Sequence, residues 1–191
     1  VFAEGNWNTG TTMADVNGDG YLDIYVCRSA ALNPDRRRNQ LFINNGDLTF
    51  TEMGKNYGVD DSGYTTQAAF FDYDNDGDLD LYILNHSTQE FAGLGKISKH
   101  NKKRKNKAYS DKLMKNDNGK FIDVSDEVGL ISNVLGFGLG IAVSDLNNDG
   151  WIDIYISNDY NEQDYLYFNN GDGTFKESLE DFIGHVSLYS M

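Results

Sequence analysis

The sequence contains few of the residues on which many enzymes and small disulfide-rich domains depend. Cysteine and proline occur once each, and histidine occurs three times. A single cysteine excludes an intrachain disulfide, and we expect Cys27 to be a small buried thiol rather than a reactive one. No apolar run reaches eighteen residues, so the sequence predicts no transmembrane helix. Membrane attachment therefore requires an anchor outside this segment.

Catalytic motifs are also missing. The sequence has no G-x-S-x-G, no H-E-x-x-H and no Walker loop. His86, His100 and His185 lie in no zinc or nucleophile pattern, and we expect packed or solvated imidazoles. We therefore predict no catalytic residue and no enzyme activity, although the number of aspartates leaves a glycosidase-like pair open.

Positive charge is scarce. The chain has 16 Lys and Arg against 30 Asp and Glu, for a formal net charge of −14. This balance argues against a nucleic-acid partner. Eleven of the aspartates fall within three short stretches, and three divalent cations bound there would bring the charge from −14 to −8. The acidity is thus largely explained by metal binding.

Those three stretches are copies of one nine-residue pattern, D-x-[DN]-x-D-G-x-[LI]-D. They span residues 15–23, 72–80 and 145–153. Oxygen-bearing side chains recur at positions 1, 3, 5 and 9, and glycine is fixed at position 6, where a tight turn needs an unhindered backbone. Ca²⁺ takes six to eight oxygen ligands, and loops of this kind supply a backbone carbonyl at position 7 as well.

We predict three Ca²⁺ sites, one for each loop. The expected ligands of the first site are Asp15, Asn17, Asp19, Asp23 and the carbonyl of Tyr21. Those of the middle site are Asp72, Asp74, Asp76, Asp80 and the carbonyl of Asp78. Those of the third site are Asp145, Asn147, Asp149, Asp153 and the carbonyl of Trp151. The middle site has four ligand carboxylates against three in each outer site, so we expect it to bind most tightly.

An EF-hand is excluded because position 12 is Val26, Ile83 or Ile156 rather than glutamate. The residues after each loop are β-branched, aromatic and alternating, which predicts a strand. The alternative is an Asx-rich hairpin turn without metal. Three copies with the same oxygen positions argue against it, because unneutralised carboxylates so close together repel one another.

Each loop belongs to a longer repeat. A segment of small and apolar residues precedes the loop, a strand follows it, and a second hairpin is built around an Asn-Gly or Asp-Gly turn. Four antiparallel strands per repeat, with loops 57 and 73 residues apart, predict an all-β fold of β-propeller blades. We expect blade units at about 8–55, 63–126 and 136–180, with 185–191 beginning a fourth. Three blades cannot close a propeller, so we expect this chain to be a segment of a longer protein.

Basic residues are concentrated between the strands of the middle unit. Seven of the sixteen lie between Lys96 and Lys107, and Arg36-Arg37-Arg38 occupies the corresponding connection of the first unit. A charge run of this kind is usually a solvated loop. The alternative is docking through the Lys96–Lys107 loop to an acidic partner or anionic surface.

Phe137-Gly138 followed by Asp145–Gly150 resembles the FG-GAP repeat, also called VCBS, of integrin-α-like propellers. The endings Asp80–Asn85 and Asp153–Asn158, with the second hairpins, resemble more narrowly the repeat region of ASPIC/UnbV-domain proteins. The first unit departs from this pattern at Arg28, where the others have asparagine, and the middle unit's second hairpin is one residue short.

The resemblance implies a Ca²⁺-binding propeller that is secreted or held at the cell surface, on the outer membrane if bacterial. We expect a binding or scaffolding module with a protein partner or a glycan or peptide ligand. An accessory lipoprotein of a TonB-dependent nutrient importer fits that expectation. The alternatives are the propeller of a polysaccharide-degrading, lyase-like enzyme and an adhesion module.

Overall fold

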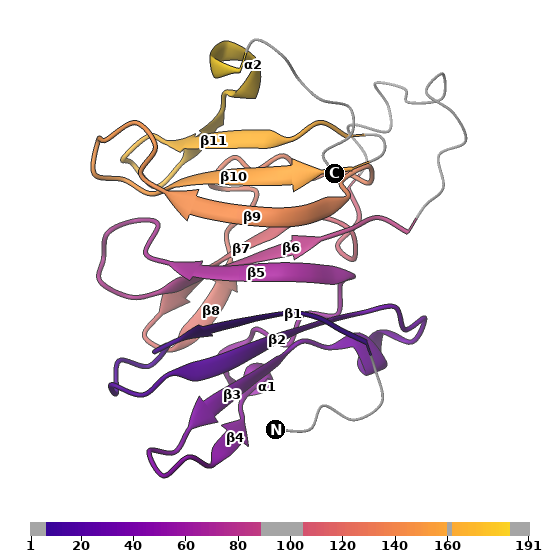
Figure 1. The fold of residues 1–191 in the computed structure, drawn as a ribbon, viewed down its shortest axis with the longest axis vertical. Coiled ribbons are helices and arrows are strands. Elements are labelled where there is room, and N and C mark those ends of the chain that lie inside the picture. The colour runs from indigo at the N-terminus through magenta and orange to yellow at the C-terminus, as the bar shows by residue number, and fades with distance from the viewer. Residues whose placement is uncertain (1–6, 89–104, 160–161, 184–191) are drawn as a thin grey trace.

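The part of the protein that the structure describes is built of three four-stranded antiparallel sheets (Figure 1). The structure, a computed structural model, describes residues 7–88, 105–159 and 162–183. The first sheet contains β1 (Trp7–Ala14), β2 (Asp23–Ser29), β3 (Gln40–Asn44) and β4 (Phe50–Glu52). The second contains β5 (Thr65–Phe71), β6 (Asp80–Asn85), β7 (Lys112–Asp117) and β8 (Lys120–Asp123). The third contains β9 (Gly138–Ser144), β10 (Asp153–Asn158), β11 (Tyr165–Asn169) and β12 (Phe175–Glu177).

Each sheet follows the chain order, so every strand is paired with its sequence neighbour. The described helices are single turns: η1 (Pro34–Arg37), α1 (Gly54–Tyr57) and α2 (Leu179–Phe182). No described helix is long and apolar enough to span a bilayer. The predicted all-β fold is confirmed, and the three sheets are blades of a β-propeller. They are called blades 1, 2 and 3 below.

The first two strands of each blade pair in the same register. The residue just before the nine-residue loop lies opposite the last residue of the loop in all three blades, as Ala14↔Asp23, Phe71↔Asp80 and Ser144↔Asp153. A common register means that the three loops span identical gaps between strands, and they can therefore adopt the same conformation.

The blades lie side by side, with β1, β5 and β9 adjacent at their inner edges (Figure 1). The hydroxyl of Thr9 donates to the carbonyl of Thr65 at 2.6 Å, and that of Thr66 donates to the carbonyl of Gly138 at 2.8 Å. A Cβ at Gly10 would lie 2.6 Å from the Thr66 oxygen. The small residues that precede each loop thus allow neighbouring blades to approach closely.

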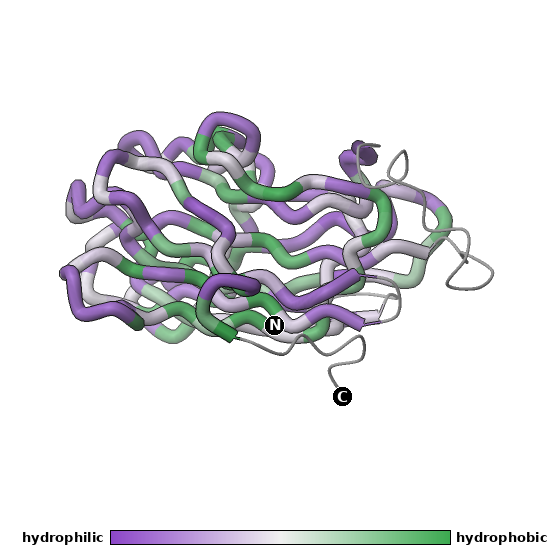
Figure 2. The backbone as a smooth tube through the Cα atoms, turned by 90° about the horizontal axis from the view of Figure 1, so that it is seen from above, coloured by the Kyte–Doolittle hydropathy of each residue, from purple (hydrophilic) through white to green (hydrophobic). Residues whose placement is uncertain are grey.

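Two apolar clusters fill the spaces between blades. The cluster between blades 1 and 2 includes Tyr25, Cys27 and Ile83, and the cluster between blades 2 and 3 includes Tyr82 and Ile154. Figure 2 shows hydrophobic segments inside the stack and hydrophilic loops at its edge. Cys27 is buried, as predicted, and burial raises the pKa of its thiol to about 12, which disfavours the reactive thiolate.

Most of the second basic segment lies outside the described residues, whereas the first is part of the folded structure. Of the predicted docking loop, residues 96–104 lie outside the described residues, as does the segment 185–191, while Lys105 forms an ion pair with Asp126. Arg37 is buried and donates to the carbonyls of Ala31, Leu32 and Ser62. Its guanidinium lies 4.1 Å from the centroid of the Tyr64 ring. Arg37 therefore stabilises the connection between β2 and β3, and its side chain is not available at the surface.

Candidate metal centres

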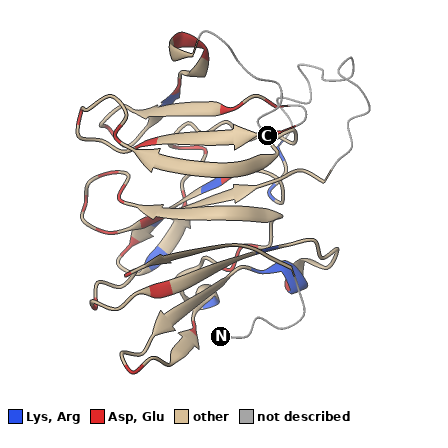
Figure 3. Cartoon of the chain, viewed as in Figure 1, with Lys and Arg blue, Asp and Glu red and all other residues tan. Residues whose placement is uncertain are grey.

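The three nine-residue loops gather at one edge of the blades. They join β1 to β2, β5 to β6 and β9 to β10, on the same side of the molecule in Figure 1. Acidic residues are concentrated at this edge, whereas the arginines of η1 lie at the opposite one (Figure 3). The sequence prediction that the acidic loops connect strands, and not helices, is confirmed.

The aspartate at position 9 is the buried anchor of each loop. Asp23, Asp80 and Asp153 are 1%, 0% and 0% exposed. One carboxylate oxygen accepts the backbone N–H of loop position 2 at 2.9–3.1 Å, and the other accepts an N–H from the end of β3, β7 or β11 at 2.8–2.9 Å. Each anchor therefore joins the loop to the second hairpin of the same blade.

The aspartates at positions 1 and 5 organise the rest of the loop. At position 1, one oxygen of Asp15, Asp72 or Asp145 accepts the N–H of position 5 at 3.0–3.2 Å. Its other oxygen accepts the N–H of the position 6 glycine at 2.7–3.0 Å. Position 5 then accepts the N–H of position 7 at 2.9–3.0 Å. These bonds turn the loop backbone around its carboxylates, an arrangement that is suited to binding a cation.

Position 4, which the sequence pattern left open, has a left-handed backbone in all three loops. Gly18, Asn75 and Asn148 have φ angles of 71°, 56° and 59°. Glycine and asparagine tolerate this region best, so their recurrence at position 4 was a usable signal. The glycine at position 6 is also left-handed, with φ between 89° and 95°.

The middle loop brings its carboxylates together most closely. Oxygens of Asp72, Asp74 and Asp80 lie within 4.8 Å of one another, and no other group of three such ligands was found among the described residues. Asp74 Oδ1 is buried and has no hydrogen-bond partner among the described residues. An unpartnered buried carboxylate oxygen is costly unless a cation is nearby, so the donor set fits Ca²⁺, which takes oxygen ligands alone.

The charge state of the middle loop reflects this crowding. Burial raises the pKa of Asp80 to about 7, with a smaller contribution from the charges of Asp74 and Asp76. The pKa of Asp76 is lowered instead, chiefly because the Asp78 N–H donates to its carboxylate. Burial also raises the pKa of Asp23 in the first loop. A bound divalent cation would favour the ionised form of all three groups.

Position 3 separates the outer loops from the middle one. Asn17 and Asn147 are exposed, and each donates from its amide nitrogen to the position 5 aspartate, at 2.9 Å and 2.8 Å. Asp74 cannot donate, and in the middle loop the ammonium of Lys115 takes this place. It pairs with Asp74 and lies 3.3 Å from Asp76. The sequence prediction did not include Lys115, which lies in β7, 41 residues beyond Asp74.

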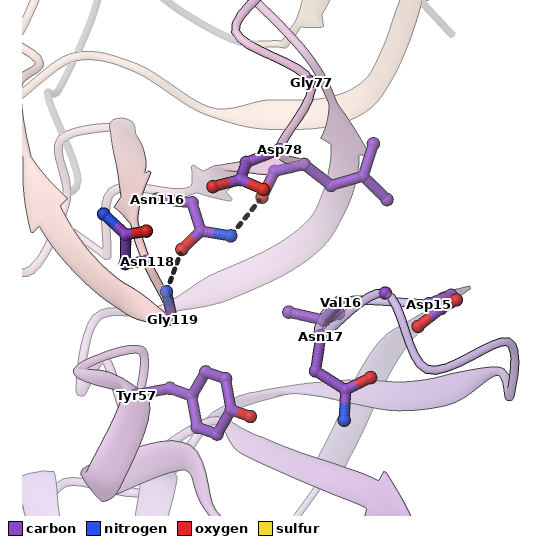
Figure 4. A pocket seen from close by; sticks show the side chains of 11 residues that line it. Asp15, Val16, Asn17, Tyr57, Gly77, Asp78, Asn116, Asn118 and Gly119 are labelled. Carbon is purple, nitrogen blue, oxygen red and sulfur yellow. Dashed lines mark hydrogen bonds between the residues drawn. The ribbon is translucent and has the colours of Figure 1, made fainter.

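A polar hollow lies beside the loops of blades 1 and 2. It has a volume of about 420 Å³ and is bounded by both loops, by α1 and by the β7–β8 turn. Figure 4 shows the side chains of Asn17, Tyr57 and Asn118 around it. Amide groups and a phenol ring are suited to a polar ligand with a flat apolar face.

Of the three histidines, His86 lies within the described residues, and its ring is packed against neighbouring side chains. His86 contacts Ser29 through Nε2 at 2.9 Å, and its ring centroid lies 5.1 Å from that of Phe137. Burial lowers the pKa of His86. The expectation of a packed imidazole is confirmed for this residue, while His100 and His185 lie outside the described residues.

Three comparisons with known proteins bear on the chain. A family model described as FG-GAP-like repeat matches residues 15–83 and 145–189. No curated protein matches the chain. A solved structure of an Agrocybe aegerita lectin, described for its specific recognition of non-reducing terminal N-acetylglucosamine, is similar at a TM-score of 0.42 and 19% identity. The match covers 94% of this chain and 37% of that one, a likeness too low to say anything about ligands. The ASPIC/UnbV resemblance stays an expectation.

Proposed function

We propose, from the premise that this chain belongs to the FG-GAP-like repeat family, that it is a non-enzymatic Ca²⁺-binding part of a β-propeller. Its role is that of a binding and scaffolding module within a larger cell-surface protein. The observation that carries the proposal is the recurrence of one loop geometry three times at a single edge, each loop closed by a buried aspartate.

Each loop holds one Ca²⁺ through the side chains at positions 1, 3, 5 and 9 and the carbonyl at position 7. In the middle loop these are Asp72, Asp74, Asp76, Asp80 and the carbonyl of Asp78. The corresponding residues of the outer loops act in the same way. The convergence of three carboxylates and the unpartnered oxygen of Asp74 support this assignment. The ion neutralises carboxylates that otherwise repel one another, and it thereby stabilises the loop edge.

The hollow between the loops of blades 1 and 2 supports the binding role. Its lining is polar and includes residues from two blades and three separate loops. A protein, glycan or peptide ligand fits such a site. Ca²⁺ loops that bind in the millimolar to micromolar range suit the outside of a cell, where the whole protein acts. In a bacterium it is attached to the outer membrane, as an accessory lipoprotein of a TonB-dependent importer.

Calcium binding is tested by calorimetric titration of the EGTA-treated chain, together with thermal melts in EGTA and in excess Ca²⁺. We expect three ions per chain and a lower melting temperature in EGTA. Stabilisation should reach about 2.7 kcal/mol per site at a hundred times the dissociation constant. Tb³⁺ luminescence excited through Trp151, at position 7 of the third loop, follows that site separately. A chain that takes up no ion and melts identically in both buffers would contradict the proposal.

The location is tested in the organism that encodes the protein. Proteolysis of intact cells should degrade the chain, and affinity purification from native outer membranes should recover a transport protein with it. Degradation only after the cells are lysed would place the protein inside and refute the surface role. Recovery without any membrane protein would refute the importer partnership alone.

A further inference from the structure

Lys115 places a positive charge inside one of the three acidic loops. Its ammonium pairs with Asp74 and lies 3.3 Å from Asp76, and it also lies 5.9 Å from the centroid of the Tyr73 ring. The side chain is 34% exposed, against 15% for Asp74. The contact is therefore partly shielded from water, where a charge pair is stronger than at the open surface.

The equivalent positions of the other blades carry no charge. In each blade, an asparagine at or next to the end of the third strand donates its N–H to the position 9 aspartate, which aligns Asn44, Asn116 and Asn169. Lys115 therefore corresponds to Ile43 and Phe168. Ile43 packs against the cluster between blades 1 and 2, and the Phe168 ring lies 4.7 Å from that of Phe182.

We propose that Lys115 acts as a built-in cation that competes with Ca²⁺ for the middle loop and makes it the weakest of the three sites. This inference rests on the proposed function. It reverses the order expected from counting carboxylates alone, in which the middle loop binds most tightly. The competition arises because Asp74 and Asp76 are both expected Ca²⁺ ligands and both hold the Lys115 ammonium.

The formal charges explain why the extra carboxylate gives no advantage. Four ligand carboxylates and one ammonium leave the ligand set of the middle loop at −3, which is also the charge of the three ligand carboxylates in each outer loop. In addition, the ammonium pairs with Oδ2 of Asp74 and lies 3.3 Å from Asp76, so a divalent cation held by these carboxylates must displace the ammonium or be repelled by its charge. The outer loops need to release only a neutral amide, that of Asn17 or Asn147, from an aspartate. A charged donor holds a carboxylate more strongly than a neutral one.

Lys115 also gives the middle loop a property that the others lack. With the ammonium in place, the acidic cluster is partly neutralised without any metal. The middle loop therefore keeps its shape at Ca²⁺ concentrations too low to fill it. At high Ca²⁺ it binds last, so the edge of the propeller responds to the ion in two stages.

The test compares the natural chain with Lys115→Met, which keeps the length of the side chain and removes its charge. Calorimetric titration should show two tighter ions and one weaker ion in the natural chain. In Lys115→Met the weak site should bind at least about tenfold more tightly, equivalent to about 1.4 kcal/mol. Lys115→Arg keeps the positive charge and should keep the weak site. Lys112→Met is the matched control, because Lys112 lies on the same strand but pairs with Asp61, away from the loop.

A second readout separates competition from a merely structural role. In EGTA, Lys115→Met should melt at a lower temperature than the natural chain, because the aspartates lose their counter-charge. In saturating Ca²⁺ its gain in melting temperature should exceed that of the natural chain. Lys112→Met should lower both melting temperatures together.

The outcomes distinguish this inference from the calcium proposal itself. If the natural chain binds Ca²⁺ but Lys115→Met leaves the weakest dissociation constant unchanged or raises it, Lys115 does not compete and only this inference fails. If neither protein binds Ca²⁺, the proposed function fails together with the inference.

Discussion

Blades 1 and 2 share one backbone plan but use different chemistry at equivalent places. At loop position 3, blade 1 has the amide of Asn17 and blade 2 has the carboxylate of Asp74. A second exchange of an amide for a carboxylate lies just before the third strand of each blade. Asn39 accepts the N–H of Arg28 at 2.8 Å, and Asp111 accepts the N–H of Asn85 at 2.8 Å.

The same hydrogen-bonded frame can thus be completed with neutral or with charged groups. Asn39 donates to the Tyr25 hydroxyl at 3.0 Å, whereas Asp111 accepts from the Tyr82 hydroxyl at 3.0 Å. The direction of the bond reverses while the geometry is kept. Blade 1 is consequently indifferent to pH at these places, and blade 2 depends on protons and on counter-ions.

The largest loss of stability should come from removing the buried aspartate at loop position 9, and it should be equal in both blades because this aspartate makes the same two hydrogen bonds in each. Asp23→Ala and Asp80→Ala each remove a buried carboxylate that accepts two backbone N–H groups. Two unpartnered donors should lower the free energy of unfolding by about 4 kcal/mol, as measured by urea denaturation in EGTA. Asp78→Ala, at an exposed side chain of the middle loop, is the control and should have almost no effect in EGTA. If one substitution lowered the free energy of unfolding by twice as much as the other, the two aspartates would not have equivalent roles.

A second effect should appear at the entry to the third strand of blade 2 and should depend on pH. Burial raises the pKa of Asp111 to about 7, above the value of about 3.9 in an unfolded chain. Between these values the folded state binds more protons than the unfolded state. Asp111 therefore makes stability fall as the pH rises from about 4 to 7, after which its contribution is constant.

Asp111→Asn copies blade 1 and should remove this dependence. Relative to the natural chain, its free energy of unfolding should rise by about 4 kcal/mol between pH 4 and pH 8. Urea denaturation across that range in EGTA measures the difference. Asn39→Asp, the reverse change, should introduce a similar dependence into blade 1. Parallel pH profiles for the natural chain and Asp111→Asn would show that Asp111 is ionised in the folded state.

The smallest effect concerns loop position 4. Gly18 has φ 71°, and a Cβ built on it meets no atom within 4 Å. Gly18→Ala should therefore destabilise the chain by about 1 kcal/mol through backbone conformation alone. Gly18→Asn should cost less, because Asn75 occupies the equivalent place in blade 2 at φ 56°. If Gly18→Ala and Gly18→Asn had the same free energy of unfolding in urea denaturation, the left-handed conformation at loop position 4 would not affect stability.

Local patterns in the sequence were sufficient for the fold and for the position of the loops. The spacing of oxygen side chains and the alternation after Asp23, Asp80 and Asp153 are set by neighbouring residues, so the strands and loops could be predicted. Which loop residues bind an ion stays a prediction. The contact between Lys115 and Asp74 depends on the register between β6 and β7, in which Leu81 lies opposite Met114.

Burial of a charged side chain was harder to predict than its position. The run Arg36-Arg37-Arg38 looked solvent-exposed because charged runs usually are. Arg37 is buried because the carbonyl of Ser62 and the ring of Tyr64 lie beside it in the fold. Aligning the second hairpins would have shown Lys115 against Ile43 and Phe168, and that alignment was a signal present in the sequence.

Two hydrogen bonds tie the loop of blade 2 to blade 3. The Asn75 amide donates to the Gly150 carbonyl at 3.4 Å, and the Asn169 amide donates to the Tyr73 carbonyl at 2.7 Å. Ordering either loop thus restricts the partner atoms of the other. By thermodynamic reciprocity, whatever tightens the loop of blade 3 must assist the loop of blade 2 by the same free energy, and the reverse. These two hydrogen bonds link the loops of blades 2 and 3 directly, so ordering one loop lowers the entropy cost of ordering the other.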